Sequence, residues 1–300
     1  MDLTLYWFMF PVSIIVATCA MMSGVGGAAL FTPLFLVIFP LLGPDYVLAS
    51  PVAAIGVALL TETFGFSSGF VGYYRRRLID FKSAVPFLAV SVPVAIFGAL
   101  MTPYLDGRVI MGAYGLLALA MAYVMYRHHA PIEHEIEALD GKSESASRPM
   151  CEITASDGTV YRYRKPRHGR GAVATSFGAF LTGMLSVGIG EVIMPQLTKR
   201  NSVPVAVAAG TSVFVVIVTI ASASFTHIST MIRAGGVNAV PWELVMYTAP
   251  GVLIGGQIGP LLQGRFSQRR TEVAIGIFFA IIAVAMGFAV FFGVRPGEAV

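Results

Sequence analysis

Long apolar segments separated by short polar ones cover most of this chain. They lie at about 4–22, 28–42, 47–72, 84–105, 108–126, 171–187, 190–198, 204–229, 243–263 and 271–293. A helix needs about 20 apolar residues to cross a bilayer, so 28–42 is marginal and 190–198 is clearly short. The pattern predicts an all-α polytopic membrane protein in which these two segments are broken or re-entrant helices.

Composition and charge agree with a membrane protein and give it an orientation. The chain is 56% hydrophobic and 12% charged, whereas soluble domains are about 25% charged. Lys and Arg collect in cytoplasmic loops, and an N-terminus placed outside puts seventeen of the twenty on the inner side. These are Arg75, Arg76, Arg77, Lys82, Arg127, Lys142, Arg148, Arg162, Arg164, Lys165, Arg167, Arg170, Lys199, Arg200, Arg265, Arg269 and Arg270.

A polar stretch, 127–170, divides the apolar segments into two groups of five. Within it, Asp157 and Gly158 lie between alternating segments, a β-hairpin signal. We expect a small cytoplasmic insert whose basic run "YRYRKPRHGR" lies against anionic lipid headgroups rather than nucleic acid. No metal site is predicted, because the spacing in one His/Glu cluster fits no standard zinc site. Its members are His128, His129, Glu133, His134 and Glu135.

The two groups of segments are related in sequence. "GALMTPYLDGR" (98–108) matches "GGQIGPLLQGR" (255–265) at an offset of 157, and Pro33 matches Pro195 at an offset of 162. Each unit has an odd number of segments, so the second is expected to be inverted relative to the first. The predicted organisation is a first transmembrane repeat (1–126), a cytoplasmic insert (127–170), a second transmembrane repeat (171–293) and a tail (294–300).

Glycine-rich stretches interrupt the apolar pattern at corresponding positions of the two repeats, "SGVGGAALFTP" (23–33) and "SVGIGEVIMP" (186–195). In inverted-repeat transporters, broken helices at such positions form the binding site. The free N–H groups at a helix start hold anions. We therefore predict a small-anion site at two facing breaks. Its backbone residues are Gly24, Gly26, Gly27, Gly188 and Gly190, with Pro33 and Pro195 supporting the breaks.

Two other interpretations of the glycines are weaker. Small residues also allow membrane helices to pack closely, but close packing alone does not account for the paired positions and the short helices that follow. Gly24, Gly26 and Ala29 fit a dinucleotide-binding pattern with Asp45 further on, but that motif requires a βαβ unit.

Ionisable and hydroxyl side chains in the apolar segments are further candidates. Charged groups at this depth are costly and usually functional, so Glu62 and Glu191 are predicted to act in proton coupling or gating. Helix capping by Glu191, or pairing of Glu62 with Thr61 or Thr63, would be the structural alternatives. His227 lies near a predicted helix end, which favours a role at the membrane surface. Hydroxyls near the breaks could donate to an oxyanion or bond back to their own helix: Ser50, Thr211 and Ser212.

The stretches "SGVGGAALFTPLFL", "SVGIGEVIMPQL" and "AVAAGTSVFV" (206–215) resemble the sulfite exporter TauE/SafE family of membrane transporters. The second stretch departs from the family at Ser186, Ile189 and Glu191, where glycine is frequent. The resemblance covers nearly all of the apolar portion and excludes the insert. It implies transport of sulfur-containing or organic anions across the inner membrane, often as export.

These features predict a secondary transporter for a small anion in a bacterial or archaeal inner membrane. The substrates considered are sulfite, other sulfur oxyanions, organosulfonates and short organic acids, with proton-coupled export expected. A membrane-embedded enzyme and an anion channel are the alternatives; scattered ionisable residues disfavour the enzyme. No cofactor or nucleotide-binding motif is expected. The sequence leaves the oligomeric state open, with a homodimer as one option.

Overall fold

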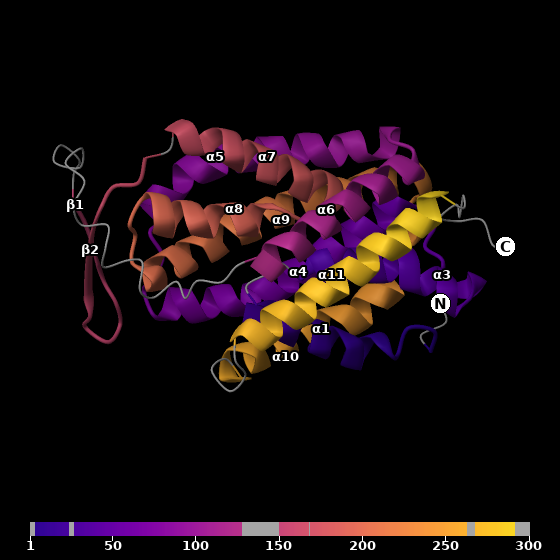
Figure 1. The fold of residues 1–300 in the computed structure, drawn as a ribbon, viewed down its shortest axis with the longest axis horizontal. Helices are drawn as coiled ribbons and strands as arrows, with labels where there is room; N and C mark the ends of the chain where they lie inside the picture. The colour runs from indigo at the N-terminus through magenta and orange to yellow at the C-terminus, as the bar shows by residue number, and fades with distance from the viewer. Residues whose placement is uncertain (1–3, 24–26, 128–149, 168, 263–267, 292–300) are drawn as a thin grey trace.

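Helices make up almost all of the described chain, together with one two-stranded sheet (Figure 1). The computed structural model describes residues 4–23, 27–127, 150–167, 169–262 and 268–291. Within these ranges, four helices are long and apolar enough to cross a membrane: Pro51–Arg75, Phe81–Tyr104, Gly107–Val124 and Val205–Gly235. Shorter apolar helices accompany them. The architecture agrees with the predicted helical, multi-pass membrane protein.

The helices of the first half follow the predicted apolar segments. Two of these helices are capped at their N-termini by side-chain oxygens. The Ser50 hydroxyl accepts a hydrogen bond from the Ala53 N–H (3.2 Å), and the Asp80 carboxylate accepts one from the Ser83 N–H (3.0 Å). In order, the elements are α1 (Met9–Ser23), α2 (Ala28–Pro33), η1 (Leu34–Ile38), α3 (Phe39–Leu42), η2 (Pro44–Tyr46), α4 (Pro51–Arg75), α5 (Phe81–Met101), η3 (Thr102–Tyr104) and α6 (Gly107–Arg127).

The second half also begins with a longer helix that is followed by a short α-helix and a π-helix. Its third α-helix runs to Gly235, six residues past the predicted end, and stops at Gly236, which adopts a φ of +76°. Met231 is still buried beyond that predicted end, so packing extends the helix past the apolar run. The elements are α7 (Gly169–Leu185), α8 (Ile189–Pro195), η6 (Gln196–Arg200), α9 (Val205–Gly235), η7 (Val237–Ala239), α10 (Trp242–Leu262) and α11 (Gln268–Phe291).

The two short predicted segments are both helices that change register at a proline. α2 ends at Pro33 and continues as the π-helical η1, and α8 ends at Pro195 and continues as the π-helical η6. Proline has no N–H to donate to the fourth residue back. After Pro33 the register lengthens, and the Phe39 N–H reaches the Leu34 carbonyl, five residues back. Such π segments are frequent at functional sites.

The predicted hairpin is present. β1 (Met150–Thr154) and β2 (Val160–Arg164) are antiparallel, and Gly158 in the turn has a φ of +84°. The Tyr163 hydroxyl donates to the Asp80 carboxylate (2.6 Å), and the Ser156 N–H donates to the Arg76 carbonyl (3.0 Å). These bonds dock the hairpin on the α4–α5 loop, at the left end of the bundle in Figure 1, opposite α3.

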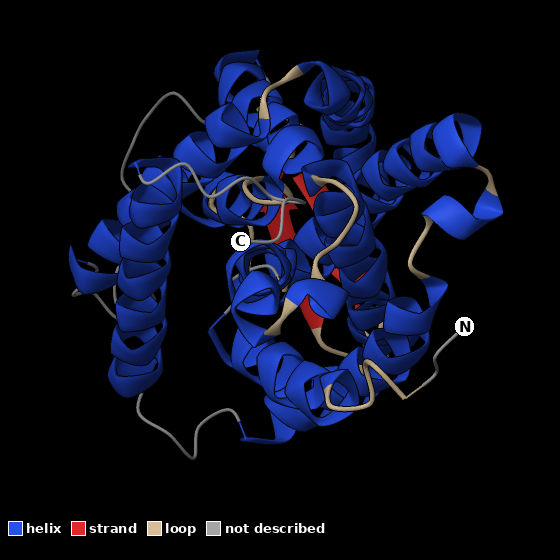
Figure 2. Ribbon diagram, turned by 90° about the vertical axis from the view of Figure 1, so that its right-hand side faces the viewer, coloured by secondary structure: helices blue, strands red, loops and turns tan. Residues whose placement is uncertain are grey.

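Helices of one half pack mainly on helices of the other. α1 packs on α10, α5 on α7, α6 on α11 and α4 on α9, with further contacts of α5 with α9 and α4 with α10. Glycines allow two close approaches: a Cβ on Gly98 (α5) would lie 2.5 Å from the Phe180 carbonyl oxygen, and one on Gly251 (α10) 2.7 Å from that of Phe10. Viewed along the bundle in Figure 2, the helices are blue and the red hairpin lies beyond them.

Candidate functional site at the two helix breaks

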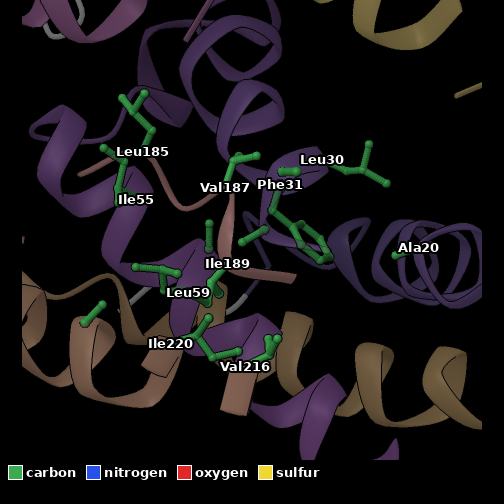
Figure 3. Close-up of a cluster of buried hydrophobic side chains, with 14 of the residues drawn as sticks. Ala20, Leu30, Phe31, Ile55, Leu59, Leu185, Val187, Ile189, Val216 and Ile220 are labelled. Carbon is green, nitrogen blue, oxygen red and sulfur yellow. The ribbon is translucent and has the colours of Figure 1, made fainter. Parts of the chain in front are cut away.

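The two broken regions meet inside the bundle. The Thr32 and Ser186 hydroxyls are 2.5 Å apart and hydrogen-bonded. Ser186 has a φ of +62°, as the chain turns out of α7. Figure 3 shows apolar side chains gathered around this junction from both halves of the chain. The labelled residues are Ala20, Leu30, Phe31, Ile55, Leu59, Leu185, Val187, Ile189, Val216 and Ile220.

Glu62 occupies the start of α2. Its carboxylate, on α4, accepts hydrogen bonds from the backbone N–H groups of Gly27 and Ala28. The side chain is 5% exposed, so these bonds replace water for a buried acid. The suggested pairing of Glu62 with neighbouring threonines is wrong: Thr61 bonds Thr248 (2.8 Å), and Thr63 bonds the carbonyl of its own helix four residues back. The backbone N–H groups at the start of α2 therefore already bind a carboxylate, that of Glu62.

The start of α8 is organised differently. Gly188 has a φ of +134°, and the Ile189 N–H donates to the Thr182 hydroxyl (2.8 Å). Gly190 lies inside the first turn, where an added Cβ would be 3.8 Å from Val216, an ordinary contact. Glu191, in the same turn, is partly exposed and interacts electrostatically with Glu62. The structure thus brings both candidate carboxylates to the junction of the breaks.

The three candidate hydroxyls bond within the protein and do not converge. Ser50 caps α4, the Thr211 hydroxyl accepts from the Asp80 N–H (2.9 Å), and Ser212 donates to the Ala209 carbonyl (2.9 Å). Because α4 and α9 run antiparallel, Ser50 lies toward one end of the bundle. Thr211 lies at the other, beside the docked hairpin. The structure does not bring Ser50 and Thr211 together.

The surface role predicted for His227 is wrong, because its side chain is fully buried. α9 is longer than the apolar run suggested, so His227 lies eight residues from the helix end. A nitrogen of its ring, Nε2, is 2.8 Å from the Gly183 carbonyl oxygen, near the end of α7. Gly56 on α4 makes room for it, because a Cβ there would lie 2.9 Å from the His227 Cβ. His227 therefore binds the end of α7, the helix that precedes the second break.

Some predicted residues lie outside the described parts of the chain. Gly24 and Gly26 are two of them, and the His/Glu cluster at positions 128–135 is another. Among the residues that the structure describes, no group of three or more His, Cys, Asp or Glu side chains could hold a metal ion.

Several residues at the breaks were not predicted from the sequence. Tyr114 on α6 donates to the Ala29 carbonyl (2.6 Å) and is 1% exposed. Thr32 and Thr182 bond across or within the breaks. Hydroxyl residues are common in membrane helices, so only their coincidence with the broken segments could have singled out Thr32 and Thr182. Tyr114 carries no such local signal.

Comparison with known proteins gives the chain its family. Residues 9–286 match the family described as "Sulfite exporter TauE/SafE". The "Probable membrane transporter protein YunE" of Bacillus subtilis is 25% identical over 267 residues, covering 87% of this chain and 89% of its own. A "Probable membrane transporter protein" of Xylella fastidiosa is 26% identical over 263 residues, covering 88% of this chain and 87% of its own. No solved structure matches the chain. The chain belongs to the sulfite exporter TauE/SafE family, and the names of its relatives indicate a membrane transporter.

Proposed function

We propose that this protein is a secondary transporter that moves a small anion outward across the inner membrane and is coupled to protons. The substrate class is sulfite, another sulfur oxyanion, an organosulfonate or a short organic acid. The family's description and the carboxylate held by backbone N–H groups at the first break support this class. The proposed site comprises Gly24, Gly26, Gly27, Gly188 and Gly190, with Glu62 and Glu191 in coupling or gating. The predicted hydroxyls Ser50, Thr211 and Ser212 are left out of it, because they do not converge.

One observation carries the proposal: the Glu62 carboxylate on the N–H groups of Gly27 and Ala28. A backbone arrangement that binds one carboxylate oxygen offers the same donors to an oxygen of a substrate anion. Substrate and the Glu62 carboxylate then compete for them. Uptake of a proton by Glu62 converts its carboxylate to a neutral carboxyl and frees the donors. Anion binding at this turn therefore rises when Glu62 is protonated, which couples substrate to protons.

An inverted-repeat architecture is part of this proposal. Exchanging α1 with α7, α4 with α9, α5 with α10 and α6 with α11 turns the six main helix pairings into one another, although the weaker α1–α11 and α7–α9 contacts have no counterpart. The same exchange of helices relates two buried hydroxyl pairs to each other. Thr61 on α4 bonds Thr248 on α10 (2.8 Å), and Ser91 on α5 bonds Thr219 on α9 (2.7 Å). Ser91 and Thr248 are separated by 157 positions, the offset of the sequence repeat. In inverted-repeat transporters, sites lie where the repeats meet.

The proposed orientation places the N-terminus outside and the insert in the cytoplasm. The hairpin of the insert bonds the Arg76 carbonyl, so it shares one side with the basic loop that follows α4. Basic loops are typical of the cytoplasmic side. Reporter fusions after Asp106 and Gly141 should report outside and inside respectively, and the reverse result would contradict the orientation.

The decisive test of transport is a counterflow assay in proteoliposomes. Vesicles loaded with unlabelled sulfite, thiosulfate, a short sulfonate or a short carboxylate are diluted into the labelled anion. We expect saturable accumulation of label with at least one of them, absent from protein-free vesicles. Flux that rises linearly with concentration would indicate a channel, and no flux with any anion would contradict the proposal.

A further inference from the structure

Pro33 creates a need for a hydrogen-bond donor in the first turn of α2. In a helix, the N–H of residue i donates to the carbonyl of residue i−4. Residue 33 is a proline and has no N–H, so the Ala29 carbonyl has no helical partner at that position. Ala29 and Pro33 are both buried. A buried carbonyl without a donor is costly, and in a bilayer the protein must supply that donor.

Tyr114 supplies it. Its hydroxyl donates to the Ala29 carbonyl at 2.6 Å, and the side chain is among the largest fully buried ones in the described chain. Beside it on α6, Gly115 lies against α11, where an added Cβ would be 3.2 Å from the Met286 Cβ. The phenol therefore reaches α2 from a helix that is itself packed in place.

Glu62 holds the same turn through other backbone groups. The carboxylate on α4 binds the N–H groups of Gly27 and Ala28, while the phenol on α6 binds the carbonyl of the next residue. Tyr114 also interacts electrostatically with both Glu62 and Glu191. Three consecutive backbone units are thus fixed by side chains of two different helices.

We infer that Tyr114 is a positioning residue of the transport site. Its hydroxyl replaces the hydrogen bond that Pro33 removes and so fixes the direction in which the Gly27 and Ala28 N–H groups point. The link of Tyr114 to transport rests on the proposed function, whereas its hydrogen bond to the Ala29 carbonyl does not depend on that function. Loss of the hydroxyl should weaken anion binding more than it slows turnover, because the donors remain but are no longer fixed.

A rescue experiment tests this inference. Tyr114→Phe removes the donor, and Pro33→Ala restores an N–H four residues after Ala29. Counterflow with one transported anion should show KM about three- to tenfold higher for Tyr114→Phe, the range that one hydrogen bond accounts for, with a smaller change in maximal rate. In the Pro33→Ala background, removing the Tyr114 hydroxyl should change KM by less than about twofold, because the carbonyl already has its partner.

Pro195→Ala is the matched control. It restores an N–H in α8, away from the Ala29 carbonyl, and should leave the KM effect of Tyr114→Phe at its full size. An effect of Tyr114→Phe that is equally large in the Pro33→Ala background, or rescued equally by Pro195→Ala, would overturn the inference. So would an unchanged KM for Tyr114→Phe.

Thermal unfolding in detergent separates this inference from the proposed function. The loss of unfolding temperature caused by Tyr114→Phe should shrink in the Pro33→Ala background, whether or not any anion is transported. If the wild-type protein moves no anion but this coupling is present, the proposed function fails and the pairing stands. If transport is present but the coupling is absent, the positioning role fails alone.

Discussion

Gly188 and Gly190 lie two residues apart at the start of α8, yet a methyl group should affect them differently. Gly188 has a φ of +134°, which costs a residue with a side chain about 1–3 kcal/mol. A Cβ there would also lie 2.9 Å from the Gly178 carbonyl oxygen and 3.3 Å from the Leu181 Cβ, and such crowding costs a further 1–3 kcal/mol or so. Gly188→Ala should therefore lower the free energy of unfolding by about 2–6 kcal/mol.

Gly190→Ala is the matched control for that substitution. Its Cβ would lie 3.8 Å from the nearest atom, on Val216, and alanine gains up to about 1 kcal/mol of helix propensity over glycine. Unfolding in mixed micelles, followed by circular dichroism, should show Gly190→Ala within about 1 kcal/mol of the wild type. Equal losses for the two variants would refute the reasoning, because they would mean that Gly188 is needed only as a small residue.

Three further experiments test the surroundings of the breaks and the hairpin. Burial, and then the hydrogen bond to the Asp80 carboxylate, raise the pKa of Tyr163 above its ordinary value of 10.0. The phenol therefore stabilises the fold fully below pH 10, and this contribution falls as the pH rises further. Tyr163→Phe should lessen that loss of stability at high pH, measured by unfolding as a function of pH. Thr32→Val and Ser186→Ala should show a coupling energy of about 1 kcal/mol in a double-mutant cycle of unfolding, and strict additivity would contradict their hydrogen bond. His227→Leu should cost about 1–3 kcal/mol by leaving an α7 carbonyl unpaired, whereas a surface histidine would tolerate the change within about 0.5 kcal/mol.

The sequence predicted the elements of the fold well because each depends on local chemistry. Apolar runs marked the helices, and Gly158 marked the hairpin turn, whose φ of +84° suits glycine. The short segments were identified by their length, and Pro33 and Pro195 fall where each changes to a π-helix. The end of α9 was predicted too early, because tertiary packing extends this helix beyond the apolar run. His227 was therefore wrongly expected near the membrane surface.

The candidate site was predictable only in part, because side-chain partners depend on which helices meet. Glu62 was recognised as a costly buried acid, but its partners are backbone groups of a helix more than thirty residues earlier. Thr211 was expected near the breaks and instead accepts a bond from Asp80 beside the hairpin. Tyr114 was missed, since its role follows from a proline in another helix.

The pH dependence of anion transport by Glu62→Gln tests the account most directly. In the wild type, protonation of Glu62 frees the N–H groups at the start of α2, so the KM for the transported anion should rise with pH in counterflow. Glutamine cannot ionise, so the KM of Glu62→Gln should stay constant across the same range. Glu152→Gln, in an exposed pair with Arg162, is the control and should follow the wild type. A Glu62→Gln variant that retains the full pH dependence of the wild type would contradict the central claim.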